Sequence, residues 1–228
     1  MGTTVSLTSA DGFQLSAYRA EPEGATRGGV VVVQEIFGVN AHIRSVVDRY
    51  AAAGFLAIAP AIFDRDKPGI ELGYTEHDIA VGRDIARGKL DFQKVLADVD
   101  AAGNAAAQAG EVGVVGYCFG GLVTAAASIN LAESFSAAVS YYGGGTVGLV
   151  DKSPAIPLMM HFGERDHAIP LDDVAKISAA WPNVTVHLYD AEHGFNCDHR
   201  GSFSAVPAAI AQARTYRFFD DHLGVASA

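Results

Sequence analysis

The sequence predicts an α/β fold, a doubly wound and mostly parallel sheet with helices on both faces. Three observations support this prediction. Apolar runs rich in β-branched residues, without polar alternation, are typical of strands buried on both faces of a parallel sheet. These runs alternate with stretches of helical composition, as in βαβ units. The 228 residues, 50% hydrophobic, suffice for one large core, so we expect residues 1–228 to form a single domain.

The chain opens with two alternating runs that flank Asp11-Gly12, which predicts an antiparallel hairpin at the sheet edge. A helix over residues 205–222 should close the fold, with Gly224 just beyond its end. The elements expected between them are strands at residues 29–34, 55–60, 111–116, 137–142, 158–162 and 184–189, helices at 42–53 and 122–130, one or two helices within 81–103, and a long polar surface loop near the site at 63–73.

The charge distribution favours a small molecule as the partner. The formal net charge is -10, and Lys and Arg are scattered along the chain, which offers no basic surface for nucleic acid or an anionic membrane. The N-terminus lacks the charged start and apolar run of a signal peptide, and no stretch has the 18 or so apolar residues of a spanning helix. We therefore expect a soluble, cytoplasmic protein, and a monomer.

Two cysteines, Cys118 and Cys197, are the only ones in the chain. A protein with an ample core has no need of a disulfide framework, so both are expected to be free thiols. The histidines and carboxylates do not fall at the close, regular spacings of a zinc site. The sequence thus predicts no metal and no cofactor.

The strongest local motif is Gly-Tyr-Cys-Phe-Gly-Gly at residues 116–121, between a predicted strand and an Ala-rich helix. It matches the nucleophile elbow, with Cys118 in the place of serine. Flanking glycines admit the close approach of strand and helix that a Cβ would block. The helix N-terminus favours the thiolate, the reactive form of the side chain. The alternative is a small buried hydrophobic residue, a common fate of a free Cys.

Candidate partners follow in the order nucleophile, acid, histidine, which is typical of α/β-hydrolases. Asp166 follows a predicted strand, and His193 follows the last one beside the small Gly194. We predict that Asp166 orients His193 and that His193 is the base for Cys118. A loop aspartate is also a common turn former or helix cap. The competing acids are Glu164, Asp172, Asp173 and Asp190, and the competing histidines are His161, His167, His187 and His199, of which His167 is the main alternative.

Attack on a carbonyl also requires donors for the oxyanion. The elbow supplies the backbone N–H of Phe119, and the turn after the first central strand offers that of Ile36. The neighbouring Glu35 would oppose a developing negative charge. On the residues alone it is a helix-capping or loop carboxylate.

Together the motifs resemble the dienelactone hydrolase family across essentially the whole chain. The resemblance implies an α/β-hydrolase fold and a Cys-His-Asp triad. It also implies hydrolysis of a lactone such as carboxymethylenebutenolide, in the breakdown of aromatic compounds through catechol-type intermediates. The motifs are QEIFGVN at residues 34–40, GYCFGG at 116–121, YYG at 141–143, GERDH at 163–167 and HGF at 193–195.

The resemblance further implies that Glu35 controls the protonation of the nucleophile and helps to produce thiolate when substrate displaces it. Family members hold the substrate carboxylate with two arginines, one of them four residues after the catalytic histidine, where this chain has Cys197. Arg200 is the candidate replacement, because a guanidinium matches a carboxylate; it is equally an exposed loop arginine. Arg83, with Arg87 nearby, is the candidate for the first arginine, and Tyr142 for a tyrosine that lines the pocket or simply packs in a strand.

Two other functions stay open on the sequence. A general carboxylesterase or thioesterase fits the motifs and the missing arginine. A non-catalytic, hydrolase-like binding protein would keep the pocket without turnover.

Overall fold

One eight-stranded sheet runs through the protein, here a computed structural model that describes residues 1–224. The strand order is β1-β2-β4-β3-β5-β6-β7-β8, in which the pairs from β4 to β8 are parallel and β2 is antiparallel to both neighbours. This order confirms the predicted α/β fold. The strands are β1 (Thr3–Thr8), β2 (Gln14–Ala20), β3 (Gly29–Val33), β4 (Leu56–Pro60), β5 (Val112–Tyr117), β6 (Ala137–Tyr141), β7 (Leu158–Gly163) and β8 (Thr185–Tyr189).

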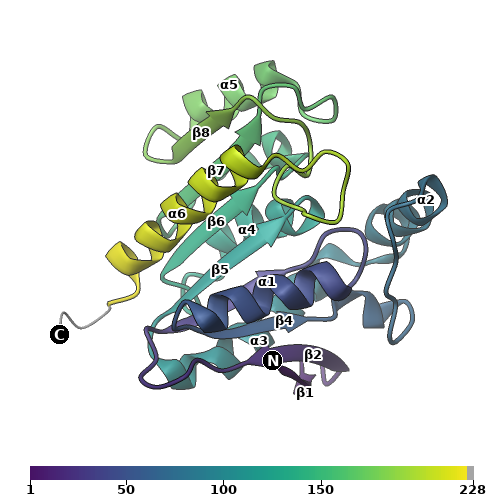
Figure 1. Cartoon of the computed structure of the whole chain (residues 1–228), viewed down its shortest axis with the longest axis vertical. Helices are drawn as coiled ribbons and strands as arrows, with labels where there is room; N and C mark the ends of the chain where they lie inside the picture. Colours follow the sequence, from purple (N-terminus) through teal and green to yellow (C-terminus); the bar gives the residue numbers. More distant parts are fainter. Residues whose placement is uncertain (225–228) are drawn as a thin grey trace.

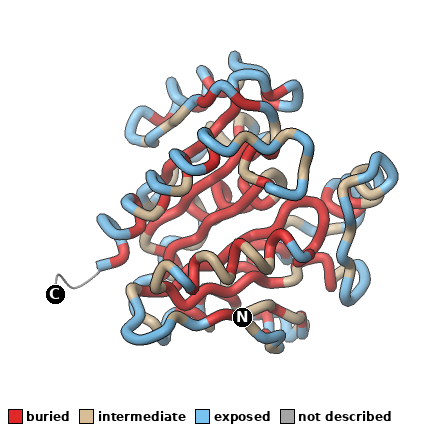
Figure 2. Tube along the Cα trace, in the orientation of Figure 1, coloured by how far each residue is buried: buried red, intermediate tan, exposed pale blue. Residues whose placement is uncertain are grey.

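Helices cover both faces of the sheet. Figure 1 shows α1 and α6 in front of the strands, with α3 and α4 behind them. The central strands are buried along their full length, whereas the helices turn exposed residues outward (Figure 2). The helix α5 was not predicted, because only Val174 and Ile177 of its ten residues are buried. The helices are α1 (Ala41–Ala52), α2 (Glu76–Asp84), α3 (Phe92–Ala106), α4 (Phe119–Asn130), α5 (Leu171–Ala180) and α6 (Ala205–His222).

The terminal elements agree with the sequence prediction. The strands β1 and β2 form the expected antiparallel hairpin, in which Leu7 faces Leu15. The helix α6 ends at His222, and Gly224 lies beyond it with a left-handed φ of 59°. At the start of α1, the Asn40 side chain accepts the Ile43 N–H at 3.2 Å, which fixes the helix directly after the loop that follows β3.

The prediction of a long surface loop near the site at residues 63–73 was right for residues 66–73, which are mostly exposed and whose Leu72 N–H donates to Phe37 on the cavity wall, but wrong for the start of the segment. Its first residues form a short 3-10 turn in which Phe63 and Asp64 are buried. Arg65 is also largely covered, because it pairs with the fully buried Asp98, 2.6 Å away, and with Asp11. No residue of this segment lines the cavity at Cys118. Arg65 thus belongs to an ion-pair network with Asp98 and Asp11 that joins distant parts of the chain.

The segment between β4 and β5 contains two helices joined by a π-helical turn, Ile85–Lys89. The helix α2 begins with a capping box made by Thr75 and Asp78, earlier than the predicted start at residue 81. A π turn widens the helix and often occurs at functional sites. Here it follows closely after Arg83 in the chain and carries Ala86 and Arg87, and all three residues line the cavity at Cys118. Within residues 1–224, no helix has both the length and the apolar character needed to cross a membrane.

Candidate active site

Cys118 lies in a strained turn between β5 and α4. Its φ of 55° and ψ of -113° are unusual for a residue with a side chain. A Cβ at Gly116 would lie 2.0 Å from the carbonyl oxygen of Gly120, and one at Gly120 would lie 2.3 Å from that of Val33. Both glycines are therefore required for the turn, as the elbow motif predicted.

Two backbone amides near the sulfur are available as donors. Phe119 is the first residue of α4, so its N–H has no partner within the helix. Ile36 lies in the loop after β3 and, like Phe119, lines the same cavity as Cys118. Among the described residues, neither amide donates to a backbone carbonyl outside regular elements. Both amides are thus free to serve as oxyanion donors, and the oxyanion hole stays a prediction.

Asp166 and His193 are brought together from the loops after β7 and β8. The Nδ1 of His193 lies 2.7 Å from Oδ2 of Asp166, and the other carboxylate oxygen accepts the Ala168 N–H at 2.8 Å. Burial disfavours the imidazolium, but Asp166 and the facing Cys118 outweigh that effect and raise the pKa of His193 to about 10. The site thus stabilises a charged imidazolium beside the sulfur.

The competing residues are arranged differently. His167, the main alternative base, is exposed. His161 is buried and pairs with Tyr189 and Thr215, at 2.9 and 3.2 Å, as expected for a histidine satisfied in the core. The competing acids are largely exposed, and Asp190 pairs with Arg165. Of the candidate acids, all within the described residues, Asp166 is the one that pairs with His193.

Glu35 is almost completely buried, with 1% of its surface exposed. Burial raises the pKa of its carboxyl group, and the nearby Arg200 opposes this shift. Arg200 Nη1 lies 3.3 Å from Oε1 of Glu35, whereas Oε2 has no hydrogen-bond partner within residues 1–224. Glu35 is therefore a loop carboxylate, one of the two roles considered from the sequence, but a buried one that contacts Arg200; the cap of α1 is Asn40.

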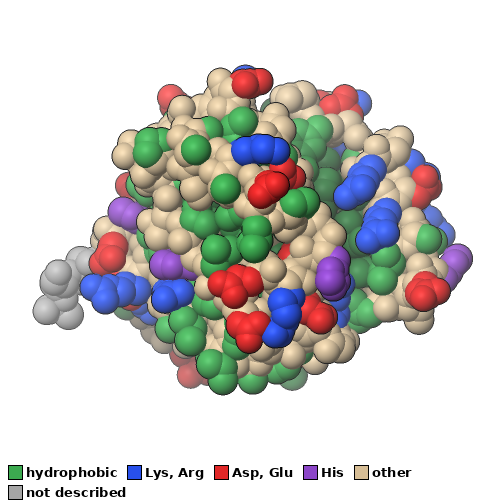
Figure 3. Space-filling model, turned by 90° about the horizontal axis from the view of Figure 1, so that it is seen from above, with side chains coloured by type: hydrophobic (Ala, Val, Ile, Leu, Met, Phe, Trp, Pro, Cys, Tyr) green, Lys and Arg blue, Asp and Glu red, His purple; other side chains and the backbone are tan. Residues whose placement is uncertain are grey.

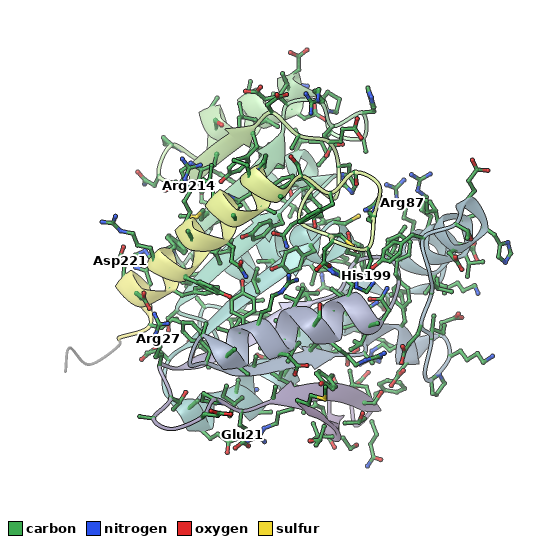
Figure 4. All side chains as sticks on the ribbon, viewed as in Figure 1. Glu21, Arg27, Arg87, His199, Arg214 and Asp221 are labelled. Atoms are coloured by element: carbon green, nitrogen blue, oxygen red, sulfur yellow. The ribbon has the colours of Figure 1, made fainter. Side chains whose placement is uncertain are left out.

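A cavity of about 350 Å³ opens at Cys118 and His193. Three guanidinium groups line it, from Arg83, Arg87 and Arg200. Arg87 projects from the segment that follows α2 (Figure 4), and the sequence had named it only as a neighbour of Arg83. Acidic and basic side chains are interspersed over the face seen in Figure 3. The described residues that line the cavity, in contrast, include these three arginines and no acid, in a protein of net charge -10. The apolar wall includes Ile36, Phe37, Ile79, Phe92, Phe119 and Leu122.

Tyr142 does not line this cavity, in contrast to the expectation from the family resemblance. It is completely buried and has a φ of 38°. Its ring packs against the imidazole of His193, with centroids 5.1 Å apart, and its hydroxyl has no hydrogen-bond partner. Tyr142 therefore packs against the imidazole of His193 and helps to hold it in place, a contact that a sequence pattern could not reveal.

A second hollow, of about 470 Å³, lies at the other end of the sheet. Leu158 and Thr185 on its wall begin β7 and β8, and His222 ends α6. Parallel sheets place functional groups at the carboxyl ends of their strands, so this hollow at the amino ends is not the candidate site.

One buried cluster has the donor atoms of a metal site. Glu35, His42 and Cys197 each place a ligand atom within 4.8 Å of the others. The Arg200 guanidinium contacts the same carboxylate and would repel a cation there. Both cysteines are free thiols, as predicted.

Comparison with known proteins identifies the family. A family profile described as "Dienelactone hydrolase family" matches residues 15–223, which is almost the whole chain. The chain belongs to the dienelactone hydrolase family. It is accordingly a hydrolase of the ester- and lactone-cleaving type, on the α/β-hydrolase fold.

Relatives of this dienelactone hydrolase family member cover nearly its full length. A Synechocystis protein provisionally named carboxymethylenebutenolidase is 36% identical, over 97% of each chain. The carboxymethylenebutenolidase of Pseudomonas putida is 31% identical, over 94% of each chain. The crystal structure of a Klebsiella pneumoniae protein provisionally named dienelactone hydrolase is 29% identical, with a TM-score of 0.85 and coverage of 97% of this chain and 100% of that one.

Proposed function

We propose that this enzyme hydrolyses a small carboxylated lactone, with Cys118 as nucleophile, His193 as base and Asp166 as the residue that orients His193. The observation that carries the proposal is the 2.7 Å contact between His193 and Asp166 beside a cysteine on a strained elbow. A nucleophile, a base within one cavity and an acid holding the base are the three parts that acyl transfer needs.

In the first half of the reaction, the Cys118 thiolate attacks the ester carbonyl and forms a carbon–sulfur bond. The charge on the carbonyl oxygen is stabilised by the N–H groups of Phe119 and Ile36. Collapse of this intermediate breaks the bond to the leaving oxygen, which takes a proton from His193. A thioester on Cys118 remains.

In the second half, His193 takes a proton from water, and the water oxygen attacks the thioester. The second tetrahedral intermediate expels the sulfur of Cys118 and releases the carboxylic acid. The raised pKa of His193 suits this cycle, because an imidazolium stabilised by Asp166 holds the proton that the leaving oxygen takes in the first half, and forms again when His193 takes a proton from water in the second.

Glu35 serves as the acceptor for the proton of Cys118 in this proposal. Its carboxyl group has a pKa raised by burial, so it can hold a proton near neutral pH more readily than an exposed glutamate. Arg200 contacts Glu35 and also lines the cavity. A substrate carboxylate at Arg200 competes with Glu35 for the guanidinium, which links substrate binding to activation of the thiol.

The anionic substrate is supported by the three arginines on the cavity wall. Guanidinium groups bind carboxylates through paired hydrogen bonds. The relatives named carboxymethylenebutenolidase suggest a lactone that carries such a carboxylate. Arg200 takes the place of the arginine missing at Cys197, three residues further along the loop.

Steady-state kinetics with carboxymethylenebutenolide and with the neutral ester p-nitrophenyl acetate test this proposal. We expect Arg83→Ala and Arg87→Ala each to lower kcat/KM for the lactone by about tenfold or more, because a charge-assisted contact is lost, while turnover of the neutral ester changes little. The control is Arg217→Ala on the exposed side of α6.

Two results would contradict the proposal. Turnover of the neutral ester alone, unaffected by the arginine variants, would favour a general esterase. Absence of turnover and of any burst with either compound would favour a binding protein.

A further inference from the structure

A buried polar cluster extends from Glu35 away from the cavity. It contains His42, at the start of α1, and Cys197, in the loop after β8, both with no exposed surface. Neither residue is on the cavity wall. The catalytic steps described above use neither of them, so the cluster needs a separate explanation.

Two buried atoms of this cluster, Oε2 of Glu35 and Nε2 of His42, lack hydrogen-bond partners in the part of the chain that the structure describes. A carboxylate oxygen of Glu35, a ring nitrogen of His42 and the sulfur of Cys197 lie within 4.8 Å of one another. Buried polar atoms without partners are costly, and such atoms in a native protein are commonly explained by function. These two belong to groups that can exchange a proton.

The other nitrogen of His42 leads to the surface. Nδ1 lies 2.9 Å from Oδ1 of Asp198, whose side chain is 39% exposed. A neutral imidazole that donates its Nδ1 hydrogen to Asp198 leaves the lone pair of Nε2 facing the interior. A chain of groups that carry or accept protons thus connects Glu35 with solvent.

The surroundings keep His42 neutral. Burial lowers the pKa of His42 to about 4, although Asp198 acts in the opposite direction. The positive Arg49 lies 3.6 Å from Asp198, and the ring of His199 is 5.6 Å from that of His42. The other neighbouring groups are Glu35, Cys197 and Tyr74. The Tyr74 hydroxyl accepts a hydrogen bond from the Cys197 thiol, with sulfur and oxygen 3.4 Å apart.

We propose that Cys197, His42 and Asp198 form a proton path between Glu35 and solvent that is separate from the residues lining the substrate cavity. The inference rests on the proposed role of Glu35 as acceptor of the Cys118 proton. His42 and Asp198 are positioning residues, since they act through Glu35 and contact no substrate. They allow the Glu35 carboxyl group to lose and regain its proton while bound substrate closes the cavity to solvent.

The path balances as a series of exchanges. The Cys197 thiol turns from Tyr74 toward Nε2 of His42 and gives its hydrogen to that nitrogen, while the carboxyl hydrogen of Glu35 moves to the sulfur. His42 then releases its Nδ1 hydrogen to Asp198, which passes it to water. After the thioester is hydrolysed, one proton returns along the same path, so Cys118 is protonated again and His42 regains its first tautomer.

The test uses His42→Gln in the full-length enzyme. We expect kcat to fall by about tenfold with KM unchanged, because proton transfer and not binding is impaired. The loss should be reversed by raising the concentration of imidazole buffer, which supplies another proton carrier. His77→Gln, on the exposed surface of α2, is the matched control.

Two further variants decide between a proton path and a packing role. Asp198→Asn is expected to show a smaller, buffer-dependent loss of kcat, and its partly exposed side chain makes misfolding an inadequate explanation. In a double-mutant cycle, His42→Gln should cause no further loss in a Glu35→Gln background, since it acts through Glu35. If the double variant instead loses kcat by the product of the two single losses, and buffer restores none of it, the proton path is contradicted and His42 has a packing role.

The outcomes also separate the two proposals. Wild-type turnover in Glu35→Gln contradicts the role of Glu35 and the path with it. Impaired turnover in Glu35→Gln, together with wild-type kinetics in His42→Gln and Asp198→Asn, contradicts the path alone.

Discussion

At the scale of single residues, the sequence predicted some of the residues at the site and missed the contacts of others. Cys118, Asp166 and His193 could be predicted as a triad because each follows a strand, in the order the fold requires. His42 and Tyr142 could not be placed, because their contacts join residues far apart in the chain. Only the tertiary fold brings such partners together.

Asp166→Asn tests the orienting role at this scale. The amide keeps the shape of the carboxylate but no longer stabilises the imidazolium, so we expect kcat to fall by about 10³ to 10⁴. The variant should also lower the pKa of His193, which nuclear magnetic resonance titration of the imidazole measures. An unchanged kcat would show that the 2.7 Å contact is structural only.

At the scale of elements, the buried strands were the most predictable part of the fold. Their β-branched runs have no other good environment than the centre of a parallel sheet. The helix α5 was missed although Pro170 precedes it and Asp172 and Asp173 lie in its first turn, as in many helix starts. Its weak apolar pattern reflects a helix that covers only the edge of the sheet, beside η4 (Thr146–Leu149) and β8.

Gly116→Ala tests the close approach of β5 and α4. The added methyl group would lie 2.0 Å from the Gly120 carbonyl, so the two elements must separate. We expect the free energy of unfolding to fall on the order of 3 kcal/mol and the elbow to lose activity. Gly148→Ala is the control, because a Cβ there meets nothing within 4 Å. Equal urea midpoints for the two variants would refute the steric argument.

At the scale of the whole molecule, buried neutral histidines make stability depend on pH. Burial lowers the pKa of His42 to about 4 and that of His161 well below its usual range. As pH falls below about 6.5, the unfolded chain binds these protons before the folded one, so stability is lost. For His42 the loss is on the order of 3 kcal/mol by pH 4. The raised pKa of Glu35 offsets part of it.

Urea unfolding between pH 6.5 and pH 4 measures this effect. We expect the midpoint to fall steadily over that range in the wild type. His161→Gln should be less stable at neutral pH, because contacts to Tyr189 and Thr215 are lost, yet show a shallower decline with acid. Parallel pH curves for the two proteins would contradict the assignment of His161 as a buried neutral group.

The central claim is that Cys118 forms the covalent intermediate. Peptide mass spectrometry of enzyme quenched with acid during turnover of p-nitrophenyl acetate tests it directly. We predict an acetyl thioester on the peptide that contains Cys118 and none on the buried Cys197, with neither adduct nor turnover in Cys118→Ala. An acetyl group on Cys197, or turnover that persists in Cys118→Ala, would contradict the account.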